Sequence, residues 1–159
     1  MFALDEPVVG KKEINYLSQA IKSGWISSLG KFVKKLELEF AKYVGVKYAI
    51  SCASGTSALS LLWQTLDLKP NDEIIMQSLT FTADGFCLKQ SGAKIVFADC
   101  DPGKFTISIE DIKRKITKKT RVISPTHLYG YAPDMNLLKK ICDKHNIILV
   151  EDCSQAIGG

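Results

Sequence analysis

Short runs of apolar, mostly β-branched residues recur along the chain from about Tyr48 onward. Each run is too short for an amphipathic helix, and its apolar positions are nearly continuous, which is typical of strands buried on both faces of a parallel sheet. The runs predict strands at Tyr48 to Cys52, Glu73 to Gln77, Lys94 to Ala98, Arg121 to Pro125 and Ile147 to Glu151.

The stretches between these runs carry apolar residues at helical spacing. Ser108 and Asp111 have the spacing of a capping box, and Asp134 is a capping aspartate directly after a proline. The pattern predicts helices at Thr56 to Leu66, Ser108 to Ile116 and Asp134 to His145, and two more before the sheet, at Lys11 to Ser23 and Lys31 to Tyr43. Strands that alternate with helices predict an α/β fold with a mainly parallel sheet flanked by helices.

The length of 159 residues favours one domain. We expect a helical segment over residues 1–47 and βα units over residues 48–159. Hydrophobic residues at 46% and charged residues at 24% are near the averages of globular proteins, which argues against disordered, fibrous and membrane proteins. No apolar run approaches the roughly 20 residues that span a bilayer, and the first residues lack a signal-peptide pattern, so we expect a cytoplasmic location.

Charge and cysteine content exclude other classes of protein. The net charge is only +4 and the lysines are scattered in pairs, which gives little support to nucleic-acid binding. The five cysteines include no C-x-x-C pair, so the sequence indicates neither a disulfide framework nor a zinc or other metal site.

Small polar residues lie between the first predicted strand and the helix after it, in Ser54-Gly55-Thr56-Ser57. A helix N-terminus offers unpaired N–H groups and the positive end of the helix dipole, and glycine allows a close approach of the chain to an anion. These residues could therefore bind a phosphate. From these residues alone, plain helix capping is the favoured explanation, because small polar residues cap most helices.

A carboxylate follows the last predicted strand, in Glu151-Asp152-Cys153-Ser154-Gln155. Ligands of open α/β sheets bind at the carboxyl ends of the strands, and a partly buried aspartate there needs a positive partner. A protonated pyridine nitrogen would serve, because Asp152 would then keep the ring cationic. A helix cap or a surface carboxylate is the plainer alternative.

Two further residues follow other strands. Phe81, in Ser78-Leu79-Thr80-Phe81-Thr82-Ala83, could stack on a flat heteroaromatic ring, although an isolated phenylalanine at such a junction usually packs inward. His127 is a single histidine without a partner in the sequence, and such residues are commonly structural.

Taken together, these segments resemble the DegT/StrS family of nucleotide-sugar aminotransferases, whose large domain has the fold-type-I architecture of pyridoxal-phosphate (PLP) dependent transferases. The resemblance extends over nearly the whole chain. Among family members, the loop after the first helix is most similar to that of GDP-perosamine synthases. The matching segments are Gly24-Trp25-Ile26-Ser27-Ser28 with Gly30, Ser54-Gly55-Thr56, Asn71-Asp72-Glu73-Ile74-Ile75, Leu79-Thr80-Phe81, His127-Leu128-Tyr129-Gly130, and Glu151-Asp152 with Gln155.

The resemblance implies a role for each candidate residue. Gly55 and Thr56 would hold the PLP phosphate, Phe81 would stack on the ring, Asp152 would pair with the pyridinium nitrogen, and Gln155 would reach the ring hydroxyl. It also implies transfer of an amino group, usually from glutamate, through PLP to a keto-sugar on a nucleoside diphosphate. The resemblance further implies that the intact enzyme is a homodimer with its active sites at the dimer interface.

The resemblance also implies a lysine that forms a Schiff base with PLP, one strand and loop after the Glu-Asp segment. The sequence ends at Gly159 before such a position, so we expect an incomplete large domain without the catalytic lysine, inactive on its own. A non-catalytic remnant or interaction module that pairs with a full-length homologue is the alternative. A nucleotide-hydrolysing domain or a dinucleotide-binding domain is disfavoured because the G-x-x-x-x-G-K-[ST] and G-x-G-x-x-G motifs are absent.

Overall fold

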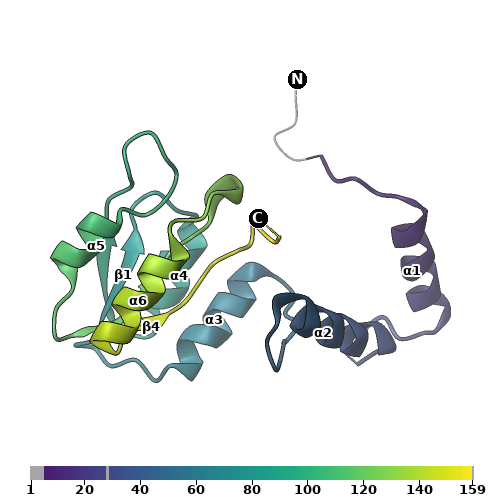
Figure 1. The fold of residues 1–159 in the computed structure, drawn as a ribbon. Coiled ribbons are helices and arrows are strands. Elements are labelled where there is room, and N and C mark those ends of the chain that lie inside the picture. Colours follow the sequence, from purple (N-terminus) through teal and green to yellow (C-terminus); the bar gives the residue numbers. More distant parts are fainter. Residues whose placement is uncertain (1–5, 28, 159) are drawn as a thin grey trace. The chain divides into compact units, whose positions relative to one another are not determined.

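The computed structural model describes residues 6–27 and 29–158 of the chain. The chain divides into two compact units, residues 1–52 and residues 53–159 (Figure 1). Ser28, one residue of the loop that resembles perosamine synthases, lies outside the described residues. No helix in the described ranges is long and apolar enough to cross a membrane.

The first unit contains two helices, α1 (Lys11–Lys22) and α2 (Lys31–Val44), within a residue or so of their predicted bounds. The Glu13 carboxylate accepts the Gly10 N–H at 2.8 Å, which caps the first turn of α1. Helix α2 ends at Gly45, whose φ of 79° lies in the left-handed region that glycine adopts at low cost. Among the described residues of this unit, only Ala41 is buried.

Tyr48 to Cys52 do not form the strand that the sequence predicts. A strand requires a neighbour to satisfy its backbone N–H and C=O groups, and this segment pairs with none of the described strands. Tyr48 and Ile50 are largely exposed. The Ser51 N–H donates instead to the Glu37 carboxylate at 2.9 Å. The apolar run is therefore present without the partner that would make it a strand.

The second unit is built on a sheet of four parallel strands in the order β2-β1-β3-β4. The strands are β1 (Glu73–Gln77), β2 (Lys94–Ala98), β3 (Thr120–Ser124) and β4 (Ile148–Leu149). The first two match their predicted bounds, β3 is displaced by one residue, and β4 is shorter than predicted. All five residues of the central strand β1 are buried. The α/β fold with a parallel sheet is confirmed.

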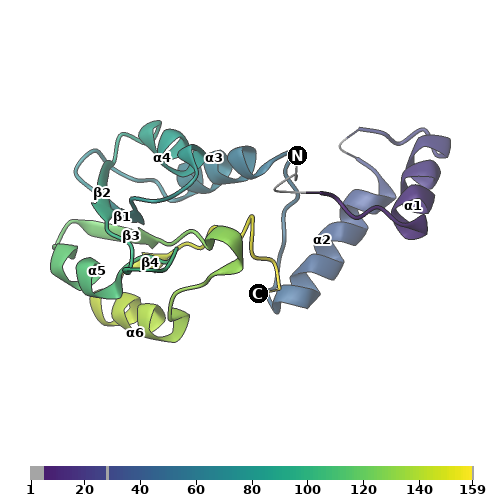
Figure 2. The same cartoon turned by 90° about the horizontal axis from the view of Figure 1, so that it is seen from above.

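Helices cover both faces of this sheet (Figure 2). Helices α3 (Gly55–Thr65) and α4 (Thr82–Lys89) lie over one face, and α5 (Ile109–Lys115) and α6 (Met135–His145) over the other. Alternate residues of β1 enter the two cores: Ile74 packs with Trp63 and Leu88, and Ile75 packs with residues of α5 and α6. Helix α4 is not among the helices predicted from the sequence.

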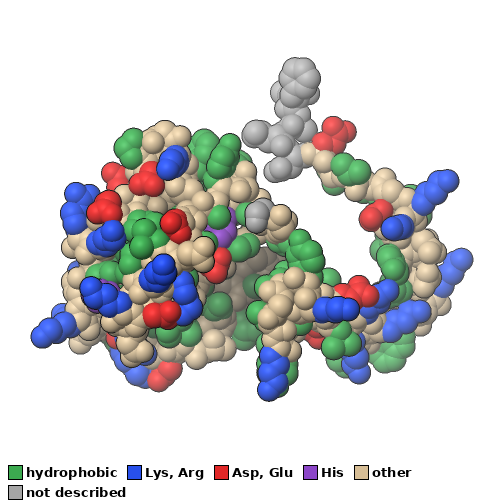
Figure 3. Space-filling model, viewed as in Figure 1, with side chains coloured by type: hydrophobic (Ala, Val, Ile, Leu, Met, Phe, Trp, Pro, Cys, Tyr) green, Lys and Arg blue, Asp and Glu red, His purple; other side chains and the backbone are tan. Residues whose placement is uncertain are grey.

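Basic and acidic side chains mix on the surface over α5 and α6 (Figure 3). Asp111 pairs with Arg114 at 3.0 Å and Lys115 at 2.6 Å, and Lys139 pairs with Asp143. This face therefore carries no single basic block of the kind that binds nucleic acid.

Candidate functional site

The carboxyl ends of the parallel strands meet at one edge of the sheet. The segment after β3 and the segment after β4 lie side by side there: the His127 N–H donates to the Asp152 carbonyl at 2.9 Å, and the Asp152 N–H donates to the Pro125 carbonyl at 3.0 Å. These bonds continue the β3–β4 pairing as an isolated bridge between Thr126 and Asp152. Asp152 thus has a fixed backbone position at the edge where open α/β sheets bind ligands.

A pocket of about 260 Å³ lies at this edge, within the second unit. It is lined by residues of α3, of the turn after β1, of the first turn of α4, and of the segments after β3 and β4. The five residues to which the resemblance assigns cofactor contacts all line it, although 100 positions separate Gly55 from Gln155, whereas His127 is not among the lining residues. The lining residues are Gly55, Thr56, Leu59, Phe81, Ala83, Thr126, Leu128, Asp152, Ser154 and Gln155.

The N-terminus of α3 forms one end of the pocket. The Ser54 hydroxyl caps the helix by accepting the Ser57 N–H at 3.2 Å. The N–H groups of Gly55 and Thr56 in the first turn have no helical acceptor, so they can donate to an anion. A side chain on residue 55 would bring its Cβ within 3.2 Å of the Ser154 hydroxyl. Glycine therefore keeps this end open. Capping and anion binding are compatible here, because the cap uses the Ser57 N–H.

Phe81 contributes an aromatic surface to the pocket. It is the N-cap residue of α4, and 66% of its surface is exposed. The expectation that an isolated phenylalanine here packs inward is therefore wrong. Its exposed ring is available to a flat ligand, for which stacking on an aromatic face is favourable.

Asp152 provides a carboxylate in the pocket lining. Burial acts to raise the pKa of this carboxyl, but hydrogen bonds from Ser154, together with the neighbouring Asp84 and His127, hold the pKa below its usual value. The Ser154 N–H donates to Oδ1 of Asp152 at 2.9 Å. Asp152 is therefore an anion at neutral pH and can pair with a cation.

Gln155 is held in place by the loop after β3. Its side-chain Oε1 accepts the Tyr129 N–H at 3.0 Å, which leaves the amide nitrogen as a donor. Tyr129 has a φ of 53°, an uncommon conformation for a residue other than glycine. This strained turn directs the Tyr129 N–H toward Gln155 and so fixes which end of the amide is free.

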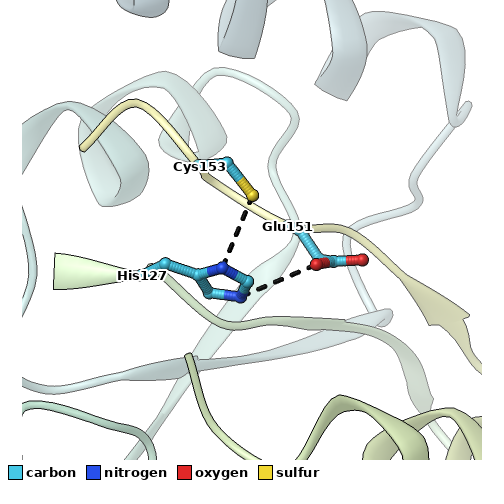
Figure 4. Close-up of side chains that lie close together, drawn as sticks. All are labelled: His127, Glu151 and Cys153. Atoms are coloured by element: carbon cyan, nitrogen blue, oxygen red, sulfur yellow. Dashed lines mark hydrogen bonds and ion pairs between the residues drawn. The ribbon is translucent and has the colours of Figure 1, made fainter. Parts of the chain in front are cut away.

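His127 has neighbours that the sequence did not reveal (Figure 4). It is buried, with Cys153 Sγ 3.5 Å from Nδ1 and a Glu151 oxygen 3.7 Å from Nε2. One ligand atom from each of these residues lies within 4.8 Å of the others, as a metal site requires. However, the sulfur and the carboxylate approach opposite nitrogens of the ring, whereas an ion binds only one of them. Among the described residues, Nδ1 contacts the Cys153 sulfur and the buried Nε2 makes no hydrogen bond, so the arrangement does not form a metal site around one ring nitrogen.

Asp84 is a site residue that sequence reasoning missed. It lies in α4, is fully buried, and accepts hydrogen bonds from the hydroxyls of Thr80 and Thr126. The available signal was an aspartate three residues after Phe81 in a stretch otherwise poor in charge. Because α4 was not recognised as a helix, the burial of this position was not predicted.

Known proteins that are similar to this chain are consistent with the geometry at this edge of the sheet. Residues 7–159 match the model of the DegT/DnrJ/EryC1/StrS aminotransferase family. The chain belongs to this aminotransferase family. The resemblance seen in the sequence motifs is thereby confirmed.

Individual members of the DegT/DnrJ/EryC1/StrS family are similar in sequence and structure. A GDP-perosamine synthase of Vibrio cholerae is 40% identical over 158 residues, which cover 99% of this chain and 43% of that protein. The crystal structure of an aminotransferase from Psychrobacter cryohalolentis superimposes with a TM-score of 0.88 at 35% identity, covering 96% of this chain and 39% of the other.

A third similar protein was solved with a ligand. The structure of a GDP-4-keto-6-deoxymannose-3-dehydratase with a trapped PLP-glutamate geminal diamine has a TM-score of 0.92 at 29% identity, covering 99% of this chain and 42% of the other. This chain therefore spans less than half the length of the family members that it matches. The match is with the N-terminal part of those longer proteins.

Proposed function

We propose that this chain is the cofactor-binding part of a PLP-dependent aminotransferase that acts on a nucleotide-linked keto-sugar. The observation that carries the proposal is one pocket lined by a helix N-terminus, an exposed aromatic ring and an ionised carboxylate. Those are the groups that complement a phosphate, a flat ring and a pyridinium nitrogen.

The residues of the pocket fit such a cofactor. The N–H groups of Gly55 and Thr56 and the Thr56 hydroxyl bind the phosphate, and Phe81 stacks on the ring. Asp152 pairs with the pyridinium nitrogen, and the amide of Gln155 donates to the ring hydroxyl. PLP, when bound, supplies an electron sink for the carbon that carries the amino group, and the Asp152 carboxylate maintains that property by keeping the ring nitrogen protonated.

The substrate class rests on the relatives. The Vibrio cholerae protein that is 40% identical is a GDP-perosamine synthase, so we assign a nucleoside-diphosphate sugar with a keto group as the amino acceptor. Glutamate is the amino donor in the proposal, in line with the PLP-glutamate species trapped in the similar dehydratase. The intact enzyme is proposed to be a cytoplasmic homodimer.

No lysine is among the described residues that line the pocket. We therefore assign the Schiff-base lysine to none of the lysines in this chain, and expect the chain alone to lack transaminase activity. Adding PLP, reducing with borohydride and mapping modified residues by mass spectrometry checks this. A single lysine labelled at a stoichiometric level would contradict it.

The absence of a lysine from the described lining of the pocket favours a second candidate function. A pocket that binds PLP without a lysine suits a non-catalytic chain that pairs with a full-length homologue. Co-purification of the two proteins, with PLP bound at their interface, would support this function over the first.

The proposal is tested by measuring PLP affinity of the full chain by equilibrium dialysis. Replacement of Thr56 by valine keeps the shape and removes one phosphate donor, so PLP affinity should fall about tenfold. Affinity for pyridoxal, which lacks the phosphate, should be unchanged. Thr65→Val at the opposite end of α3 is the matched control and should bind PLP like the wild type.

A second pair of variants tests the nitrogen contact. Asp152→Asn removes the anion that pairs with the pyridinium nitrogen, and PLP affinity should fall about tenfold or more. Asp143→Asn removes an exposed carboxylate of α6 and should have no effect. Equal PLP affinities for the wild type and Asp152→Asn would overturn the proposed orientation of the ring.

A further inference from the structure

Gln77 is a polar residue inside the core, at the last position of the central strand β1. All five residues of β1 are buried, and Gln77 is completely so. Side chains alternate along a strand, so Gln77 lies on the same face of the sheet as Ile75. A buried amide requires an acceptor for each of its two hydrogens and a donor for its oxygen, because water does not reach it.

The Gln77 amide finds these three partners in the backbone of three different loops. Its Oε1 accepts the Thr126 N–H at 3.3 Å, and its Nε2 donates to the Leu79 carbonyl at 2.6 Å and to the Phe105 carbonyl at 3.4 Å. Leu79 follows β1, Phe105 lies between β2 and α5, and Thr126 follows β3. The partners also fix the orientation of the amide, since the reverse would turn its oxygen toward two carbonyls.

Two of these loops carry residues of the pocket. Phe81 lies two residues after Leu79 and presents its ring to the pocket. Thr126 also lines the pocket and forms the isolated bridge with Asp152. The Gln77 amide therefore joins the segment that carries the aromatic ring to the segment with which Asp152 is aligned.

The third loop extends this support to Gln155. The Phe105 ring packs edge-on against the Tyr129 ring, with their centroids 5.3 Å apart. The Tyr129 N–H in turn donates to Oε1 of Gln155. By contrast, none of the three Gln77 hydrogen bonds goes to helix α3, whose N-terminus forms the phosphate end of the pocket.

We propose that Gln77 is a positioning residue, whose side-chain amide joins three loops at the carboxyl edge of the sheet and so sets the spacing of the residues that contact the cofactor ring. This role deepens the proposed function and rests on it, because Phe81, Asp152 and Gln155 are the residues assigned to the ring. Gln77 itself does not line the pocket.

The role of Gln77 has a consequence that a general loosening of the fold does not share. Without the amide, the three loops lose their common partner, and contacts to a flat ring should weaken. The N–H groups at the start of α3 should still bind an anion, because no Gln77 hydrogen bond holds them. Affinity for the ring and affinity for phosphate should therefore separate when Gln77 is replaced.

The first measurement follows hydrogen exchange in the full chain by NMR, without any ligand. In the wild type, the side-chain amide of Gln77 should exchange at least about tenfold more slowly than that of Gln64, an exposed glutamine of α3. In Gln77→Met, the backbone amide of Thr126 should exchange about tenfold faster than in the wild type. Exchange of the Gln77 amide at the rate of Gln64, or an unchanged Thr126 amide, would overturn the inference.

The second measurement compares ring and phosphate binding. Gln77→Met keeps the length of the side chain and removes its hydrogen bonds. The ring probe is pyridoxine, which has neither the aldehyde nor the phosphate of PLP and so does not react with lysines, and the anion probe is inorganic phosphate. Pyridoxine affinity should fall about tenfold, and phosphate affinity should stay within about twofold.

Gln64→Met is the matched control and should bind both probes like the wild type. Equal losses for the two probes in Gln77→Met would indicate a general loosening and contradict the positioning role, as would an unchanged pyridoxine affinity.

Gln77→Glu provides a second variant with a different readout. Its carboxylate keeps the acceptor for the Thr126 N–H but, when ionised, has no proton for the carbonyls of Leu79 and Phe105. Protonation restores one donor. Relative to the wild type at the same pH, pyridoxine affinity should therefore fall as the introduced carboxyl ionises, with its titration followed by carboxyl-carbon NMR. A relative affinity that stays constant through that titration would contradict the inference.

These measurements separate the failure of this inference from that of the proposed function. If the Gln77 and Thr126 amides are protected but the wild type binds neither pyridoxine nor PLP, the proposed function fails and the role of Gln77 in ring binding fails with it. If the wild type binds PLP and pyridoxine, and Gln77→Met binds pyridoxine equally well, the positioning role alone fails.

Discussion

The two units of the chain differ in how far their amphipathic helices bury their apolar residues. Helices α1 and α2 of the first unit are amphipathic, yet Ala41 is the one buried residue described there. In the second unit, helices of the same kind cover both faces of a parallel sheet and bury two apolar clusters. An apolar stripe predicts a helix; its burial depends on a second surface that covers the stripe.

The two units also differ in whether they carry the candidate site. The pocket lies wholly in the second unit, at the edge of the sheet whose helices are held by the two clusters. Side chains there are fixed by packing beneath them, which is what a binding site needs. Most apolar residues described in the first unit are exposed, and none of its described residues is among those that line this pocket.

The largest expected effect comes from one substitution made in both units. Leu138 of α6 is fully buried, and Leu17 of α1 is 64% exposed. Leu138→Ala should lower the free energy of unfolding by about 2–5 kcal/mol, whereas Leu17→Ala should change it by less than about 0.5 kcal/mol. Urea denaturation of the full chain, at concentrations where it is monomeric, measures both. A loss at Leu17 as large as at Leu138 would mean that the α1 stripe is covered.

A smaller effect is expected at Asp111, a carboxylate of the second unit that accepts the Asp99 N–H at 2.8 Å and pairs with Lys115. The Lys115 hydrogen bond, the Asp99 N–H and Arg114 lower the pKa of Asp111 to about 2, against the opposing effect of burial. Asp111→Asn should cost about 1–2 kcal/mol at neutral pH.

The pH dependence of Asp111 follows from the sign of the shift. Its carboxylate contributes fully to stability above pH 3.8, the ordinary pKa, and the contribution is lost as the pH falls toward 2. The difference between wild type and Asp111→Asn should therefore shrink over this range. A difference that stays constant down to the lowest pH would show that the charge of Asp111 is not what stabilises the fold.

The smallest effect concerns Glu37, the counterpart of Asp111 in the first unit. Its carboxylate accepts the N–H and the hydroxyl of Ser51, both at 2.9 Å, and these bonds lower its pKa. Because the group is only partly buried, Glu37→Ala should leave the urea midpoint nearly unchanged and mainly speed hydrogen exchange of the Ser51 amide. If the Ser51 amide exchanges equally fast in the wild type, the hydrogen bond from Ser51 to the Glu37 carboxylate does not protect it in solution.

Much of the second unit could be predicted from local sequence signals. The strands β1 and β2 follow from apolar runs, and the caps Ser108 and Asp134 follow from their spacing to the helices that they begin. These features are predictable because each depends on residues within a few positions of one another. The candidate residues of the pocket were also indicated by local signals: Phe81 and Asp152 follow the apolar runs that form β1 and β4, and Gly55 and Thr56 begin helix α3.

What could not be predicted depends on residues distant in sequence. Tyr48 to Cys52 have the composition of a strand but no described neighbour to pair with. The apolar spacing in α4 is too weak to indicate a helix, so Asp84 was not recognised as buried. Its contacts with Thr126, and those of His127 with Cys153, join segments more than twenty positions apart. Such contacts form only in the folded sheet, so the local sequence of either segment does not indicate them.

The most direct test of the central claim is to follow the backbone amides of the full chain by NMR while PLP is added. The account predicts that the amide signals of Gly55, Phe81 and Asp152 shift together with one affinity, and that pyridoxal without the phosphate leaves Gly55 unshifted. Shifts confined to one of these segments, or spread over surface lysines instead, would contradict a single pocket that holds the phosphate, the ring and its nitrogen.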